Sequence, residues 1–256
     1  MDFQQQKDIF KEYVEQFDMN NPKIQLKLAH TFGVIHASEY IMRQLKLDEK
    51  EQELGRLIGL LHDIGRFEQL KRYNSYDDSI VSHTECGLDL LFKQHKILEF
   101  TEDSKDDNII YEAIKNHGVF QIDKRLGERE LLHTLIIRDA DKLDNFRVKE
   151  VSTMEAMLDM SEEEVGKTTI TDEIFKCYMN HEPIRYEHRK TPMDMWLSYL
   201  AYIFDLNYKA SFQYIKEKEY IDKLIARIPY ADNVTRERME QVRLCSKAYI
   251  ENKIKE

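Results

Sequence analysis

Residues 54–67 read LGRLIGLLHDIGRF, and this stretch decides the fold that the sequence predicts. Its large apolar residues recur at the i, i+3, i+4 and i+7 positions of one helical face; they are Leu54, Leu57, Ile58 and Leu61. The pattern predicts a helix from about residue 50 to residue 64, with Gly65 as its C-terminal stop. His62 and Asp63 then lie at the end of an apolar helix, where a charged carboxylate is unfavourable unless it has a partner.

The composition favours helices along the whole chain. Gly (8) and Pro (4) are scarce among the 256 residues, whereas β-sandwiches and barrels need many turn residues. We therefore expect an all-α protein. Its length suits one domain, or one domain with an appended lobe.

Charge, hydropathy and cysteine usage exclude several classes of protein. The net charge of -10 argues against a nucleic acid polymer as partner. No apolar stretch approaches the ~18–20 residues that span a bilayer, and the N-terminus lacks the basic and apolar segments of a signal peptide. Cys86, Cys177 and Cys245 are widely spaced, form no CxxC pair and suit a reducing compartment. We therefore expect a cytoplasmic protein without a membrane partner.

Helical periodicity continues on both sides of the opening stretch. Further helices are expected at 24–45, from about Ser82, at 109–117, 128–147, 171–180, 192–215, 218–227 and 235–254. The polar segment 66–81 is expected to form a loop over the mouth of a pocket. The acidic segment 159–168 predicts a boundary between a helical domain at 20–150 and a C-terminal helical lobe at 165–256 packed on it. A helix within 1–19 is expected to belong to the first domain.

Polar residues that can bind metals recur on the inward faces of these helices. His30, His117 and Asp141 each lie three or four residues from an apolar residue of the same helix. Each has a simpler explanation, because a single inward histidine usually bonds a backbone carbonyl and an HD pair often arises by chance. Their recurrence on several helices, together with His62 and Asp63, favours a shared site for a divalent cation.

The order of these residues is similar to that of a known family. His30, then His62-Asp63 within LLHDIGR, then Asp141 within DADKLD resembles the HD superfamily of metal-dependent phosphohydrolases. The resemblance covers roughly residues 24–147. It implies an HD-domain helical bundle in which these four residues bind a metal ion, with His36 as the second choice for the first ligand.

The resemblance also implies a second ion. His83, in SHTECGLDLL, and His117, in AIKNHG, resemble the additional histidines of binuclear family members, in which Asp63 would bridge the two ions. Imidazole and carboxylate together suit Mn, Fe, Co, Ni or Zn and tolerate Mg. The expected cofactor is therefore one or two divalent metal ions.

Cationic side chains beside these motifs are candidates for binding a phosphoryl group. Arg66 follows HDIG and Lys142 follows Asp141, and we expect both to act in catalysis together with Asp63. The alternative for the two cations is a solvated charge or a salt bridge with a neighbouring acid, Glu68 or Asp144.

Other charged residues are expected to play supporting roles. Asp77 or Asp78, Glu85 and Asp144 are candidates for orienting a ligand histidine. Glu85 and Asp144 are also candidates for a general base. Lys71 and Arg72, in the expected loop, are weaker candidates for binding the substrate phosphate.

The resemblance implies a metal-dependent phosphohydrolase. Its metal-activated water would cleave a phosphomonoester or phosphoanhydride in a small phosphorylated substrate, with a nucleotide as one candidate. Two alternatives stay open: a di-iron HD-type oxygenase, which uses a similar ligand set, and a binding or regulatory module whose metal is structural. No GYP triplet occurs, unlike in the family members that cleave cyclic dinucleotides. The substrate and the oligomeric state are left open.

Overall fold

The computed structural model describes residues 1–74, 78 and 80–256. This described part consists of helices joined by turns and contains no strand, which confirms the predicted all-α fold. The chain divides into two compact units, Met1–Asp141 and Lys142–Glu256. None of the described helices is long and apolar enough to cross a membrane.

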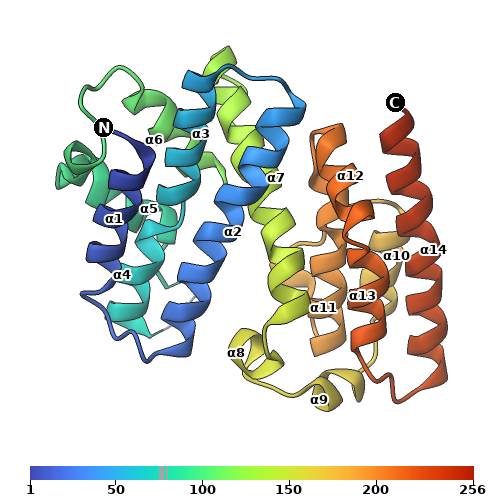
Figure 1. Ribbon diagram of the computed structural model, residues 1–256. Coiled ribbons are helices and arrows are strands. Elements are labelled where there is room, and N and C mark those ends of the chain that lie inside the picture. The colour runs from blue at the N-terminus through green and yellow to red at the C-terminus, as the bar shows by residue number, and fades with distance from the viewer. Residues whose placement is uncertain (75–77, 79) are drawn as a thin grey trace. The chain divides into compact units, whose positions relative to one another are not determined.

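The first unit contains the helices from α1 to the first part of α7 (Figure 1). Their bounds are α1 Phe3–Val14, α2 Pro22–Gln44, α3 Glu49–Leu61, α4 Ile64–Tyr73, α5 His83–Leu88, η1 Asp89–Lys93, η2 Lys96–Glu99, α6 Asp107–Asn116 and α7 Glu128–Val151. α2 and α3 pack along each other, and α3 also contacts α1 and α6. The buried apolar faces of these helices form the core of the unit.

The two long helices at the centre of this unit begin at capped residues. Before α2, the Asn21 side chain accepts a hydrogen bond from the Lys23 N–H (2.9 Å), and Pro22 occupies the first helical position. Before α3, the Asp48 side chain accepts one from the Glu51 N–H (3.0 Å). Such caps satisfy the N–H groups that have no partner within the helix.

The segment 66–81, predicted to be a loop, is helical over its first half. α4 spans Ile64–Tyr73, so Gly65 lies inside a helix and does not serve as the stop that we predicted. Phe67 and Leu70 are buried. These residues form an apolar face that the polar neighbours concealed in the sequence. The end of the segment includes residues 75–77 and 79, which lie outside the described part.

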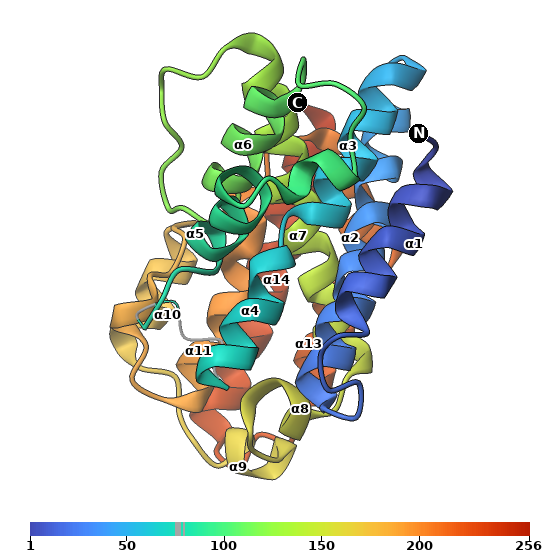
Figure 2. The same ribbon diagram turned by 90° about the vertical axis from the view of Figure 1, so that its left-hand side faces the viewer.

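Gly65 has a different role, because α4 and α5 cross closely there (Figure 2). A Cβ atom at position 65 would lie 2.1 Å from the carbonyl oxygen of His83 and 2.4 Å from the backbone nitrogen of Gly87. Both contacts are with backbone, which cannot rotate away. Glycine at 65 therefore allows the start of α4 to lie directly against the backbone of α5.

The second unit contains the rest of α7 and all later helices. Their bounds are α8 Met154–Leu158, α9 Glu162–Gly166, α10 Asp172–Met179, η3 Tyr186–His188, α11 Pro192–Leu200, η4 Ala201–Asp205, α12 Lys209–Glu217, α13 Tyr220–Arg227 and α14 Asn233–Lys255. The single helix predicted at 192–215 is divided into α11, η4 and α12. Leu206 interrupts it with an extended backbone (φ −92°, ψ 145°).

The predicted boundary segment and the aromatic residues can both be located in this unit. The acidic segment 159–168 contains α9, which starts with a capping box of Ser161 and Glu164, while the two units divide within α7. The aromatic residues pack in the core: Trp196 and Tyr178 are fully buried, and the Trp196 Nε1–H donates to the Leu224 carbonyl (3.3 Å).

Candidate metal centre

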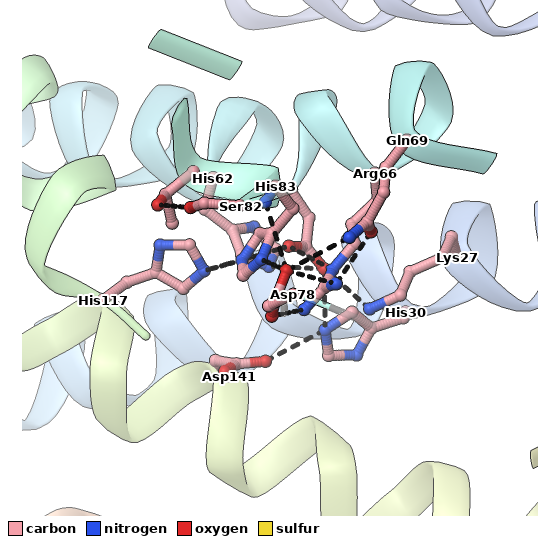
Figure 3. A network of polar contacts seen from close by, with 12 residues as sticks. Lys27, His30, His62, Arg66, Gln69, Asp78, Ser82, His83, His117 and Asp141 are labelled. Atoms are coloured by element: carbon pink, nitrogen blue, oxygen red, sulfur yellow. Dashed lines mark hydrogen bonds and ion pairs between the residues drawn. The ribbon is translucent and has the colours of Figure 1, made fainter. Parts of the chain in front are cut away.

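Six helices bring the six predicted metal ligands of the first unit together (Figure 3). They are His30 in α2, His62 and Asp63 at the junction of α3 and α4, His83 at the start of α5, His117 at the end of α6 and Asp141 in α7. The four histidines and Asp63 are buried, and none is more than 6% exposed. The Asp141 side chain is 24% exposed, so the cluster reaches the surface on that side.

The two carboxylate oxygens of Asp63 face different pairs of histidines. Oδ2 lies 3.8 Å from His30 Nε2 and 3.6 Å from His62 Nε2. Oδ1 lies 3.3 Å from His83 Nε2 and 3.8 Å from His117 Nε2. Asp141 Oδ1 approaches the first pair, at 3.0 Å from His30 Nε2. Asp63 therefore stands between two groups of nitrogen donors.

Hydrogen bonds from Nδ1 to backbone carbonyls fix the tautomer of His62 and His117. The Nδ1–H of His62 donates to the Gly59 carbonyl (2.8 Å), and that of His117 donates to the Ile114 carbonyl (2.7 Å). A carbonyl oxygen only accepts, so Nδ1 carries the hydrogen in both neutral rings. The Nε2 lone pairs are thereby directed at the cluster.

The Nε2 atoms of His83 and His117 lack a hydrogen that would join them. His83 Nδ1 donates to Asp78 Oδ1 (2.7 Å), yet its Nε2 lies only 3.1 Å from His117 Nε2. Two lone pairs at this distance repel each other unless a proton or a metal ion lies between them. His62 Nε2 is buried and has no hydrogen-bond partner among the described residues. The donor set therefore fits one or more divalent cations.

The electrostatics favour the protonation states that a metal ion requires. Burial lowers the pKa of His62 to about 4; burial and the nearby Arg66 guanidinium lower the pKa of His83 to about 4. Burial alone would raise the pKa of Asp63, but the Lys27 ammonium and His62 hold it well below its usual range. At neutral pH His62 and His83 are therefore neutral imidazoles and Asp63 is an ionised carboxylate.

Asp78 and Arg66 support the His83 side of the cluster. Besides His83 Nδ1, Asp78 accepts the His83 backbone N–H (3.1 Å) and both terminal nitrogens of Arg66 (2.9 and 3.0 Å). Arg66 Nε lies 3.6 Å from Asp63 Oδ1. The predicted catalytic Arg66 thus bridges a metal-ligand candidate and the residue that orients His83.

Several other predicted residues have local partners. In the second unit Lys142 pairs with Asp205 (3.0 Å) and Asp144 with Arg147 (2.5 Å).

Three other predicted residues lie on the first unit. Arg72 pairs with Glu68, and Lys71 lies over the Phe17 ring. The Glu85 side chain is exposed in the first turn of α5. His36, the second choice for the first ligand, is also exposed. Asp77 lies outside the described residues.

Two basic residues at the cluster were not found from the sequence. Lys27 Nζ lies 2.7 Å from Asp63 Oδ2. Arg138 is buried, and one of its terminal nitrogens donates to the carbonyls of Asn116, His117 and Val119 (2.9, 3.2 and 2.6 Å), which fixes the turn around His117. The available signal was helical spacing: Lys27 precedes His30 by three residues, and Arg138 precedes Asp141 by three.

Comparison of the chain with known proteins and family models finds one match. Residues 28–145 match the family model of the HD domain. No curated protein and no solved structure matches the chain. The matched range begins within α2 and ends within α7, so it includes every histidine and aspartate of the cluster. Residues 28–145 therefore form an HD domain of the superfamily of metal-dependent hydrolases, as the order of the histidines and aspartates predicted.

Proposed function

We propose that this protein is a metal-dependent phosphohydrolase that cleaves a phosphomonoester or phosphoanhydride in a small phosphorylated substrate. The observation that carries the proposal is the arrangement around Asp63, whose two oxygens each face a pair of imidazole Nε2 atoms. His30, His62 and Asp141 would hold one divalent cation. His83 and His117 would hold a second, with Asp63 shared between the two ions.

The metal supplies the part of the chemistry that side chains do not, because a divalent cation lowers the pKa of a bound water and polarises a phosphoryl oxygen. The residues of the chain hold and orient the reacting groups. Asp78 fixes the His83 ring, while the carbonyls of Gly59 and Ile114 fix those of His62 and His117. Asp63 and Asp141 supply negative charge that balances the cations.

The positive charge around Asp63 favours an anionic substrate. Lys27 and Arg66 lie against opposite oxygens of Asp63. Guanidinium and ammonium groups stabilise the charge that develops on a phosphoryl group during its transfer. Lys142 is a further candidate for this contact and would first have to leave Asp205.

The test is a measurement of two reactions on protein freed of metal and reloaded separately with Mn, Fe, Co, Zn or Mg. Phosphate release is measured over a panel of phosphomonoesters and nucleotides, and oxygen uptake is measured in parallel. Phosphate release that needs metal and is absent in His62→Ala supports the proposal. Two irons per chain with oxygen uptake and no phosphate would instead assign an HD-type oxygenase. Bound metal with neither reaction would assign a binding or regulatory module.

A further inference from the structure

Lys27 is the cation closest to Asp63 among the ion pairs of the described residues. Its Nζ lies 2.7 Å from Oδ2, the oxygen that faces His30 and His62. The Lys27 side chain is 18% exposed and that of Asp63 is 4% exposed, so water screens the pair only weakly. Figure 3 shows Lys27 and His30 on the same helix and on the same side of the cluster.

The position of this ammonium conflicts with a metal ion bound by the same oxygen. A divalent cation held by His30, His62 and Oδ2 would bring like charges together at short range. The histidines cannot give way easily, because the Nδ1 atom of His62 is anchored to the Gly59 carbonyl. Lysine has a flexible four-carbon stem and can move its charge by several ångströms.

The two cations beside Asp63 differ in how firmly they are held. Arg66 forms a two-point contact with Asp78 through both terminal nitrogens, and it also donates to Gln69 (2.8 Å). A planar guanidinium in such a contact loses several hydrogen bonds if it moves. Lys27 contacts Asp63 Oδ2 through an ammonium group at the end of a flexible stem. Because this ammonium faces the oxygen shared with His30 and His62, and its stem can move, Lys27 is the cation that can yield to a metal ion.

We propose that Lys27 is a displaceable counter-ion of Asp63, which it neutralises while no metal is bound. When a metal ion takes Oδ2, the Lys27 ammonium is released and binds the phosphoryl group of the substrate. The proposal rests on the metal centre of the proposed function. It assigns Lys27 two successive partners, a carboxylate and then a phosphate.

The first test is calorimetric titration of the metal-free protein with Mn²⁺. Lys27→Met retains the length of the stem and removes the charge, so the metal no longer competes with an ammonium. We expect Mn²⁺ to bind about tenfold more tightly to this variant than to the unmodified protein. Unchanged or weaker binding would overturn the proposal. Lys50→Met, an exposed residue ~18 Å before His62 on α3, is the matched control and should bind Mn²⁺ as the unmodified protein does.

The second test compares melting temperatures with and without Mn²⁺. Without metal, Lys27→Met leaves Asp63 buried without this counter-ion, so its Tm should fall below that of the unmodified protein. With saturating Mn²⁺ the difference should disappear, because the metal then neutralises Asp63. A difference that persists with metal would assign Lys27 a purely structural role. If Lys27→Met does not fold without metal, Lys27→Gln is measured in the same way.

The third test addresses the second partner of Lys27, with inorganic phosphate as the probe. Phosphate should bind the Mn²⁺-loaded Lys27→Met variant about tenfold more weakly than the loaded unmodified protein, and Lys27→Arg should restore most of the affinity. Equal phosphate affinity in Lys27→Met would overturn the substrate contact. These readouts need no turnover. Absence of phosphate release from every substrate would therefore reject the hydrolase while leaving the competition between Lys27 and metal standing.

Discussion

Two polar clusters of the first unit are built around buried histidines and use them in different ways. In one, His133 Nε2 lies 2.7 Å from Glu51 Oε2, and Arg129 joins Glu51 (2.9 Å) to Asp106 (3.1 Å). Every contact there joins a donor to an acceptor. Around Asp63, by contrast, Nε2 lone pairs face one another and face a carboxylate. The first cluster is therefore joined internally by donor–acceptor contacts, whereas the second leaves nitrogen and oxygen atoms suited to a metal.

The largest difference between the two clusters is expected when one histidine or carboxylate is removed from each. Asp63→Ala should abolish stoichiometric metal binding and lower phosphate release by about three orders of magnitude, because both groups of nitrogens lose their shared carboxylate. His133→Gln should lose stability and keep its metal, because Glu51 and Arg129 serve only the fold. Metal analysis and initial rates give both results. Full metal content in Asp63→Ala would refute the assigned centre.

The cluster around Asp63 should also respond to pH when metal is absent. His62 and His83 have folded-state pKa values of about 4, lowered from an ordinary value of 6.5. Between these values the unfolded chain binds more protons than the folded one, so stability present above pH 6.5 is lost as the pH falls toward 4. Each histidine contributes on the order of 3 kcal/mol to this loss.

Denaturant unfolding in a chelator, at intervals from pH 7 to pH 4.5, measures this loss. His62→Gln should show a shallower pH dependence, because one of the two titrating groups is gone. Stability that does not change over this range in the unmodified protein would contradict the electrostatic description of the cluster.

Removing a residue that orients a ligand histidine should reduce metal affinity less than removing the ligand itself. Asp78→Asn keeps the shape of the side chain but weakens its bonds to His83 and Arg66, and should reduce metal affinity about 10- to 100-fold. Glu51→Gln, which removes the corresponding acid of the other cluster, should leave metal affinity unchanged. Calorimetric titration with Mn²⁺ compares the two. Equal affinities would show that Asp78 does not tune the centre.

The smallest effect is expected at Lys142. Its ion pair with Asp205 must break before it can contact a phosphate, so Lys142→Ala should raise KM only a few-fold and leave the metal bound. Asp205→Asn should lower KM, because it releases the lysine. Steady-state kinetics on a phosphorylated substrate separate the two variants. A KM that neither substitution changes would restrict Lys142 to its ion pair.

The long helices could be predicted because their apolar faces repeat over many residues. α2, α3 and α7 lie close to the predicted ranges. α4 could not be found in this way, because Phe67 and Leu70 are separated by polar residues and only their burial reveals the face. Gly65 shows the same difficulty. From sequence, a glycine after an apolar helix indicates the end of that helix, even where its role is to allow two helices to cross closely.

The order of residues along the chain predicted the candidate metal ligands, but not the tertiary contacts around them. The resemblance named His30, His62, Asp63 and Asp141, but helical spacing alone does not show that distant helices bring them together. Lys27 was missed because a lysine on a helix normally lies in solvent. Its ion pair with Asp63 depends on how α2 packs against the junction of α3 and α4, which is a tertiary contact.

Anomalous diffraction from crystals of the Mn²⁺-loaded protein tests whether Asp63 lies at a metal centre. We expect at least one anomalous peak beside Asp63, within about 2.3 Å of a carboxylate oxygen and of two histidine Nε2 atoms of the cluster. A second peak on the other oxygen would establish a binuclear centre. Saturating Mn²⁺ with no peak among these residues, or with peaks only elsewhere, would contradict the assignment.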